Sequence, residues 1–373
     1  MSLHVLLLVL ASTAIQDPPA RSCETCKDRG VIACKLCATR TCKSERGYSS
    51  CSVEGECPDC GGARFRGCTF CQHAPEIDIG ARRGEIAKWR ESLKPIDDFM
   101  VKRDLVHVES PHFVLTFDLK KLDNKSASNP HDAAHLYLDR VESLFADFSA
   151  DAGAVDEDFS NKTHVMVWAG EKDQEKASSK YTLEKTTTLA KLMGKKPVVS
   201  IAFGKWRLRS DADLHHAVVH QVAHCLLSNV YDGVWTGNMK GGWLDEGVAH
   251  LYEDRVCGEV AVWCYLSDEQ VKALKLGRFE TEVASALDQA PDFTSVASVD
   301  TVSLSANQRV WAWSYCDYIV RKHPGKLGAV AKLVKKQKPA SEAIQSALGL
   351  SLTDFQLDWS TWVKATYSAK SKR

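Results

Sequence analysis

The sequence predicts an α+β protein in which a small cysteine-rich module precedes a larger domain. Ten of the 14 cysteines lie between Cys23 and Cys71, and the other four are spread over the remainder of the 373 residues. After the cysteines, strand-like patterns come first and helical patterns follow, an order typical of the α+β class. The composition, 44% hydrophobic and 26% charged, is that of a globular protein.

The charge balance argues against nucleic acid as a partner. The 48 Lys and Arg residues equal the 48 Asp and Glu residues in number. A protein that binds nucleic acid usually has more basic than acidic residues, and an acidic tail would give more acidic than basic residues. At about 150 residues per domain, the length predicts two or three domains.

Residues 1–20 are predicted to be a signal peptide. The apolar run LHVLLLVL at 3–10 is followed by small residues up to Ala14, where we expect cleavage. The run is shorter than the about 20 residues needed to span a bilayer. We therefore expect an exported, extracytoplasmic protein without an integral membrane segment after cleavage. Because no Lys or Arg precedes the run, a buried amino-terminal strand is the alternative.

Residues 21–75 are predicted to be a zinc-binding module. Two residues between thiolates allow one turn to present both sulfurs to one ion, and two such turns complete a Cys₄ zinc site. The alternative in an exported chain is a disulfide scaffold. Cys42 and Cys51 stand outside the pairs and are candidates for a disulfide. The four CxxC pairs, and hence the eight predicted zinc ligands, are Cys23, Cys26, Cys34, Cys37, Cys57, Cys60, Cys68 and Cys71.

These repeats resemble the cysteine-rich region of DnaJ-type chaperones over residues 23–73. The resemblance implies two zinc ions, with the first CxxC pair joined to the fourth and the second to the third. Only CPDCGG at Cys57 comes near the family's CxxCxGxG repeat, and no J-domain turn is present. We therefore interpret the module as a metal-stabilised spacer or interaction module and not as a co-chaperone.

The segments that follow have simple patterns. Residues 76–104 are predicted to be a linker helix that is broken near Pro95. In the domain at 105–373, alternation predicts strands at 112–119, 164–168 and 198–203, and apolar residues at helical spacing predict a helix through 134–148. Helical patterns then continue almost to the end of the chain.

The helix predicted at 211–229 carries a histidine pair that could bind a metal ion. In DADLHHAVVHQVAHCLLSN, with Asp211 or Asp213 as N-cap, His220 and His224 stand four apart and share one helix face. This is the spacing of the HExxH zinc helix. Glu246 follows in GGWLDEGVAHLYED and offers a carboxylate as third ligand. The alternative is a pair of histidines packed in the core.

The HxxxH helix followed by WLDEGVAHLYED resembles the gluzincin (peptidase MA-like) zinc metallopeptidases over residues 105–366, and the helical ending agrees. The resemblance implies a gluzincin-like domain with a mixed sheet, a zinc helix and a helical C-terminal half. It implies zinc at His220, His224 and Glu246, and a substrate backbone paired with the strand at 198–203. It also implies a tyrosine that stabilises the oxyanion, for which Tyr315 is the candidate, with Tyr318 or Trp311 as alternatives. For each of the three, packing in the core is the competing role.

Gln221 stands where this family has its general-base glutamate. An amide cannot accept the proton of a zinc-bound water, and acid–base assistance contributes roughly 10²–10⁴ in rate. We therefore expect a zinc-binding pseudo-peptidase that binds a peptide or protein ligand. Two alternatives stay open, an active zinc metallopeptidase that uses another base and a scaffold protein without metal at this site.

Several polar neighbours are expected to support the ligands. Asp245 should point away from the ion and orient a histidine from behind. His250 and Glu253 either orient the histidine ligands or satisfy other buried polar groups. His216 is the alternative ligand in a triad shifted by one turn. The four late cysteines are interpreted as buried small side chains, with a Cys257–Cys264 disulfide as the alternative. They are Cys225, Cys257, Cys264 and Cys316.

Overall fold

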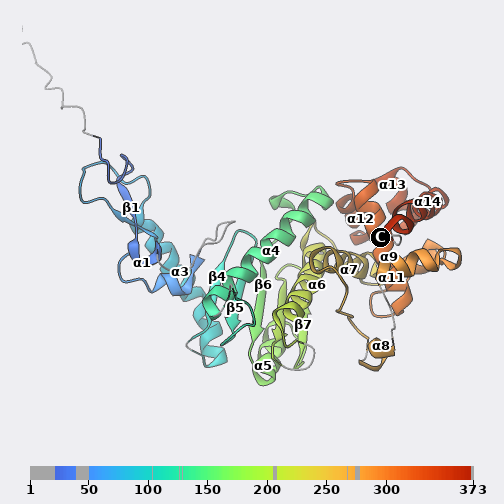
Figure 1. The fold of residues 1–373 in the computed structure, drawn as a ribbon, viewed down its shortest axis with the longest axis horizontal. Coiled ribbons are helices and arrows are strands. Elements are labelled where there is room, and N and C mark those ends of the chain that lie inside the picture. The colour runs from blue at the N-terminus through green and yellow to red at the C-terminus, as the bar shows by residue number, and fades with distance from the viewer. Residues whose placement is uncertain are drawn as a thin grey trace, which may run out of the picture.

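The computed structural model describes residues 22–38, 50–102, 104–125, 127, 129–204, 208–266, 268–273 and 278–370. Along its long axis, Figure 1 shows the cysteine-rich module at one end, a sheet with its helices in the middle, and a helical region at the other end. The predicted signal peptide at 1–20 and Cys42 lie outside the described residues.

The cysteine-rich module has little regular structure and almost no apolar core. Strands β1 (Val31–Ala33) and β3 (Phe65–Gly67) pair antiparallel, and two short helices, α1 (Lys35–Ala38) and α2 (Ser52–Gly55), follow the turns. Its buried cluster consists of four cysteines and Ala63. So small a core cannot by itself offset the entropy of folding, so the module needs a bound ion or another cross-link.

The larger region is built on a mixed sheet of six strands, in agreement with the α+β prediction. The order is β2-β4-β5-β6-β8-β7, with β5, β6 and β8 parallel and the other pairs antiparallel. The first strand comes from the cysteine-rich stretch. The strands are β2 (Ser50–Cys51), β4 (Val106–Glu109), β5 (Phe113–Asp118), β6 (Thr163–Trp168), β7 (Leu189–Leu192) and β8 (Val198–Ala202).

Both faces of this sheet are covered by helices. On β6, Val165 and Val167 face the main core with α4 (Pro130–Ala152) and α6 (Asp211–Asn229). The alternate residues Met166 and Trp168 face a second cluster with α3 (Ile79–Met100) and α5 (Glu171–Tyr181). The sheet is therefore the middle layer of three, as the alternation of a strand requires.

The prediction that Pro95 breaks the linker helix is wrong. Helix α3 runs from Ile79 to Met100 with Pro95 inside it. Proline removes one helical hydrogen bond, but Leu93 and Ile96 are buried against the sheet on either side of it. Packing of this apolar face outweighs the local cost of proline.

Helices form the rest of the chain. Helix α7 (Gly242–Cys257) packs between α6 and α11 (Ala306–Lys322). The contact with α11 requires glycine at Gly247, since an added Cβ would lie 2.6 Å from the Ala312 carbonyl oxygen. The remaining elements are α8 (Asp268–Ala273), α9 (Phe279–Ser285), α10 (Phe293–Ala297), α12 (Leu327–Lys335), α13 (Ala340–Leu348), α14 (Leu352–Lys370) and the 3₁₀ turns at Asp156–Asp158 and Leu287–Gln289.

The start of α6 is fixed by two sets of polar contacts. Ser210, and not Asp211 or Asp213, is the N-cap, and it forms a reciprocal capping box with Asp213. Asp211 instead accepts two hydrogen bonds of 2.7 Å from the Arg140 guanidinium of α4 and one from Tyr137. These contacts hold the histidine helix in register with α4.

We predict that Asp211→Asn lowers the free energy of unfolding by about 1–3 kcal/mol, the usual range for hydrogen bonds to a charged group. Burial alone would raise the pKa of Asp211, but Arg140 and Asn124 hold it below its ordinary value. The stabilisation is therefore present above about pH 4 and is lost as the pH falls through the folded-state pKa. Denaturant unfolding at pH 7 and pH 3 measures both effects.

Asp123, which precedes Asn124 in the sequence, provides the control. Because this residue is exposed, Asp123→Asn should leave the free energy of unfolding unchanged at both pH values. Equal stability of Asp211→Asn and the wild type at pH 7 would contradict the account.

Candidate metal centres

The eight paired cysteines gather into two groups of four. The first CxxC pair meets the fourth and the second meets the third, which is the pairing that the DnaJ-type resemblance implied. Within each group the four sulfurs lie within 4.8 Å of one another. The groups are Cys23, Cys26, Cys68 and Cys71, and Cys34, Cys37, Cys57 and Cys60.

The sulfur–sulfur distances fit a shared ion. Two thiolates on a tetrahedral ion with bonds of about 2.3 Å lie about 3.8 Å apart, whereas a disulfide bond is about 2.05 Å long. The distance is 3.8 Å for Cys23–Cys68 and for Cys34–Cys57. It is 3.4 Å for Cys26–Cys71 and 3.3 Å for Cys37–Cys60, and all eight side chains are free thiols.

Each group contains one thiol that ionises easily. A backbone N–H of Cys26 lowers the pKa of Cys23 to about 7. Burial raises the pKa of Cys57, but backbone N–H groups at Cys60 and Asp59 outweigh it and bring that pKa to about 7. Because the thiolate is the form that binds metal, each group offers a first ligand near neutral pH.

The second site lies where α6 and α7 pack together. His220, His224 and Glu246, which the sequence proposed as ligands, come together there and are fully buried. The two Nε2 atoms lie 3.2 Å apart, and imidazoles on a tetrahedral ion with bonds of about 2.0 Å would lie about 3.3 Å apart. A Glu246 carboxylate oxygen lies 3.7 Å from His224 Nε2.

Carboxylates of α7 fix the orientation of both histidines. Glu253 lies 2.9 Å from His220 Nδ1, and Asp245 lies 2.9 Å from His224 Nδ1. With Nδ1 held in this way, each Nε2 is directed at the centre, an arrangement common in metal sites. Asp245 thus lies where we expected it. His216 also bonds to Glu253, at 2.8 Å, and His250 lies 3.2 Å from the Val262 carbonyl oxygen.

Cys264 is a fourth member of this site that the sequence analysis did not identify. Its sulfur lies 3.3 Å from His220 Nε2 and 3.7 Å from His224 Nε2, close to the about 3.5 Å expected for sulfur and nitrogen on one tetrahedral ion. Gln221 Nε2 donates to the same sulfur at 3.2 Å. The alternative of a Cys257–Cys264 disulfide is wrong, because both are free thiols.

Helix α11 contributes a cation to this site, and its candidate Tyr315 packs in the core instead. Arg309 is buried, its Nη1 lies 2.5 Å from a Glu246 carboxylate oxygen, and its Nη2 donates to the Thr301 carbonyl. Tyr315 lies outside this group. Its hydroxyl donates to the Pro291 carbonyl at 3.3 Å, and its ring packs on Trp359.

The charges at the centre leave room for a divalent cation. The anions are Glu246, Asp245 and Glu253, joined by Cys264 as a thiolate, while Lys191 and Arg309 are the cations. His216, whose pKa Cys257 and Glu253 raise to about 10, adds a third positive charge beside Glu253. Four negative charges against three positive ones leave at least one uncompensated. Buried charge without compensation is expensive, so protons or a metal ion must supply the difference.

The pKa shifts agree with this count. Burial raises the pKa of the Cys264 thiol, but Lys191 and His220 outweigh burial and hold it well below its usual range. Burial lowers the pKa of His220, but Cys264 and Glu253 raise it to about 10. Without metal the site therefore takes up protons, which a bound cation would release. One Glu246 oxygen is paired with Arg309, and the other lies 3.7 Å from His224 Nε2, on the side of the two imidazoles. The residues thus fit a metal ion.

A groove lies directly beside this centre. The cavity of about 690 Å³ is bounded by β7, by residues 184–188 before it and by residues 261–265, and His216, Gln221 and Cys264 reach its wall. Strand β7 is the edge of the sheet here. The strand at Val198–Ala202, expected to pair with a substrate, is bonded on both sides by β6 and β7, so that expectation is wrong.

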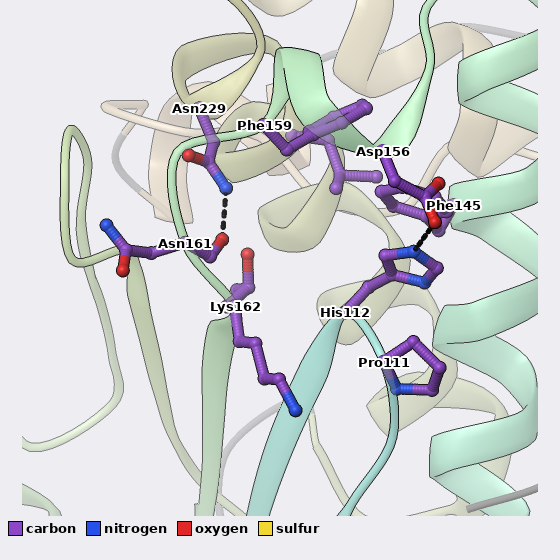
Figure 2. A pocket seen from close by; sticks show the side chains of 10 residues that line it. Pro111, His112, Phe145, Asp156, Phe159, Asn161, Lys162 and Asn229 are labelled. Carbon is purple, nitrogen blue, oxygen red and sulfur yellow. Dashed lines mark hydrogen bonds and ion pairs between the residues drawn. The ribbon is translucent and has the colours of Figure 1, made fainter.

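A smaller cavity of about 220 Å³ lies near the other end of α6 (Figure 2). His112 lines it and is paired with Asp156 at 3.3 Å. Glu142, which does not line the cavity, holds the other ring nitrogen of His112 at 2.7 Å. On the other side Asn229 donates to the Asn161 carbonyl at 2.6 Å. The charged side chains that line this cavity already have partners, since Lys162 is paired with Glu109. We therefore assign the cavity no chemistry.

Comparison with known proteins adds no family. No family model matches the chain, and no curated protein matches it. Within the described residues, no helix combines the length and the apolar character needed to cross a membrane.

We predict that Cys57→Ser and Cys68→Ser each remove one metal ion per chain, and that the double variant removes two. Each substitution takes one ligand from a different group of four, so the losses should add. Metal analysis of protein purified under reducing conditions measures the count. Cys316→Ala, a buried thiol outside both groups, is the control and should lose none. Counts that do not change with any variant would contradict metal binding by these groups.

Proposed function

We propose that the larger domain is a gluzincin-like metallopeptidase fold that binds zinc without hydrolysing peptides efficiently, and that it binds an extended peptide beside the metal. The observation that carries the proposal is the position of Cys264, whose sulfur lies within 3.7 Å of both histidine Nε2 atoms. The cysteine-rich module is proposed to hold two further zinc ions for structure.

Two separate features disfavour hydrolysis. Catalytic zinc sites keep one position open for water, whereas structural sites are closed by four protein ligands. With Cys264 as the fourth ligand beside His220, His224 and Glu246, no water would occupy that position. Gln221 would in any case be unable to take the proton from such a water, because a neutral amide is not basic. Its NH₂ group donates to Cys264 instead.

The edge of the sheet supports the peptide-binding part of the proposal. An exposed edge strand can add an extended peptide through backbone hydrogen bonds, and β7 is the edge strand that borders the groove. Three carboxylates line the same groove, those of Glu171, Glu184 and Asp213, against one ammonium group, that of Lys191. We therefore propose an extended peptide with basic side chains as the ligand.

We predict that the double variant Gln221→Glu/Cys264→Ala gains hydrolysis of fluorescein-labelled casein, while the wild type shows none above the chelated blank. The double variant restores both an open position and a base, and the base alone contributes roughly 10²–10⁴ in rate. Gln221→Glu alone should stay inactive, because the thiolate still closes the site.

The matched control is Gln221→Glu/Cys264→Ala/His220→Ala, which should lose both the gained activity and the metal. Hydrolysis by the wild type that is abolished by His220→Ala would contradict the proposal and support an active peptidase with another base. Absence of metal from the His220 site in the wild type would support a scaffold without metal there.

We predict that the wild type binds a ten-residue lysine-rich unstructured peptide more tightly than a glutamate-rich one of the same length, measured by fluorescence anisotropy at low ionic strength. Glu184→Lys should weaken binding of the basic peptide by several-fold, because it reverses one charge that lines the groove. The exposed Glu76→Lys, on the cysteine-rich side, is the control. Equal binding of both peptides would contradict the assignment of a basic ligand.

A further inference from the structure

We propose a further metal site, formed by Cys51, His131 and His135, that fastens the cysteine-rich stretch to the larger domain. The ligand atoms of these three side chains lie within 4.8 Å of one another. They belong neither to the two groups of CxxC cysteines nor to the site at His220, so the proposal does not depend on the function proposed above.

The two histidines are presented by one face of α4. They stand four apart in its first two turns, where i and i+4 side chains are neighbours. The start of this helix is well defined, because Asn129 caps it and accepts from the Asp132 N–H at 2.9 Å. The imidazole rings lie 4.8 Å apart and are almost perpendicular, at 87°. The helix therefore holds two nitrogen ligands in a fixed relation.

Cys51 reaches these rings from a different part of the chain. It ends β2, which pairs with β4 through Ser50↔Glu109 and Cys51↔Val108. Its sulfur lies 3.3 Å from His131 Nε2, and sulfur and nitrogen bound to one tetrahedral zinc would lie about 3.5 Å apart. The geometry matches that at Cys264 and His220, where the corresponding distance is also 3.3 Å.

The surroundings suit a metal ion of the zinc class. Cys51 and His135 are 2% and 4% exposed, and the His131 side chain is 14% exposed. One thiolate and two neutral imidazoles form a soft and nitrogen-rich ligand set, which favours Zn²⁺ over Mg²⁺ or Ca²⁺. Three protein ligands leave one tetrahedral position for a further donor.

Such an ion would explain how a very short strand holds its place. A strand of two residues has few backbone hydrogen bonds, and short pairings of this kind are weak. Cys51 lies between the second and third CxxC pairs in the chain. A bond through metal to α4 would therefore tie the cysteine-rich stretch to the core of the larger domain.

The test is the number of zinc ions per full-length chain, measured by native mass spectrometry after purification under reducing conditions with added Zn²⁺. Cys51→Ala, His131→Gln and His135→Ala should each lose one ion relative to the wild type, and the three changes combined should also lose only one. Cys316→Ala and His323→Ala, which change residues outside every candidate group, should lose none. In a His220→Ala background, His131→Gln should remove a further ion.

Of these variants, His131→Gln should disturb folding least, because its side chain is partly exposed in the first turn of α4. In this variant, hydrogen exchange at residues 50–55 should become faster while the remainder of the sheet is unchanged. Unchanged zinc content in both Cys51→Ala and His131→Gln would overturn the proposal. A Cys42–Cys51 disulfide found by peptide mapping without reduction would also overturn it.

Discussion

The packing of α6 against α7 is the contact on which the centre of this protein depends. It buries two histidines of one helix against three carboxylates of the other, and Glu253 and Asp245 each hold one imidazole at 2.9 Å. Such a cluster is costly to bury unless its charge is balanced. Two neighbouring elements supply cations that offset part of the negative charge. Lys191 comes from the sheet edge and Arg309 from α11. Each is directed at one of the anions.

The need to balance the buried charge also connects the structure with the proposed function. A divalent ion would supply the positive charge that the side chains lack, and its ligands would then be His220, His224, Glu246 and Cys264. A thiolate in this position would make the site a structural one. The groove beside it, bounded by an edge strand and acidic side chains, would then serve binding and not turnover. The bound metal would then stabilise the surface that binds the peptide.

Much of this arrangement was predictable from sequence because its signals are local. The i, i+4 histidines, the glutamate on the next helix and the CxxC turns each depend on spacing within one element. Alternation likewise predicted the strands β5, β6 and β8. The failures involve contacts between distant segments. No periodicity places Cys264 or Arg309 near Glu246, and the short strands β4 and β7 carry too little pattern to be recognised. The helix break predicted at Pro95 was wrong, because packing of α3 against the sheet outweighed the local tendency of proline to interrupt a helix.

A crystal structure of the full chain grown with zinc tests directly whether four side chains close the metal site. Anomalous differences would be measured at the zinc absorption edge. The account predicts a peak between His220 and His224 Nε2, with Glu246 and the Cys264 sulfur completing a tetrahedron at bonding distance. A zinc peak whose fourth ligand is water, with Cys264 turned away, would contradict the closed site. Absence of a peak there would contradict the metal centre itself.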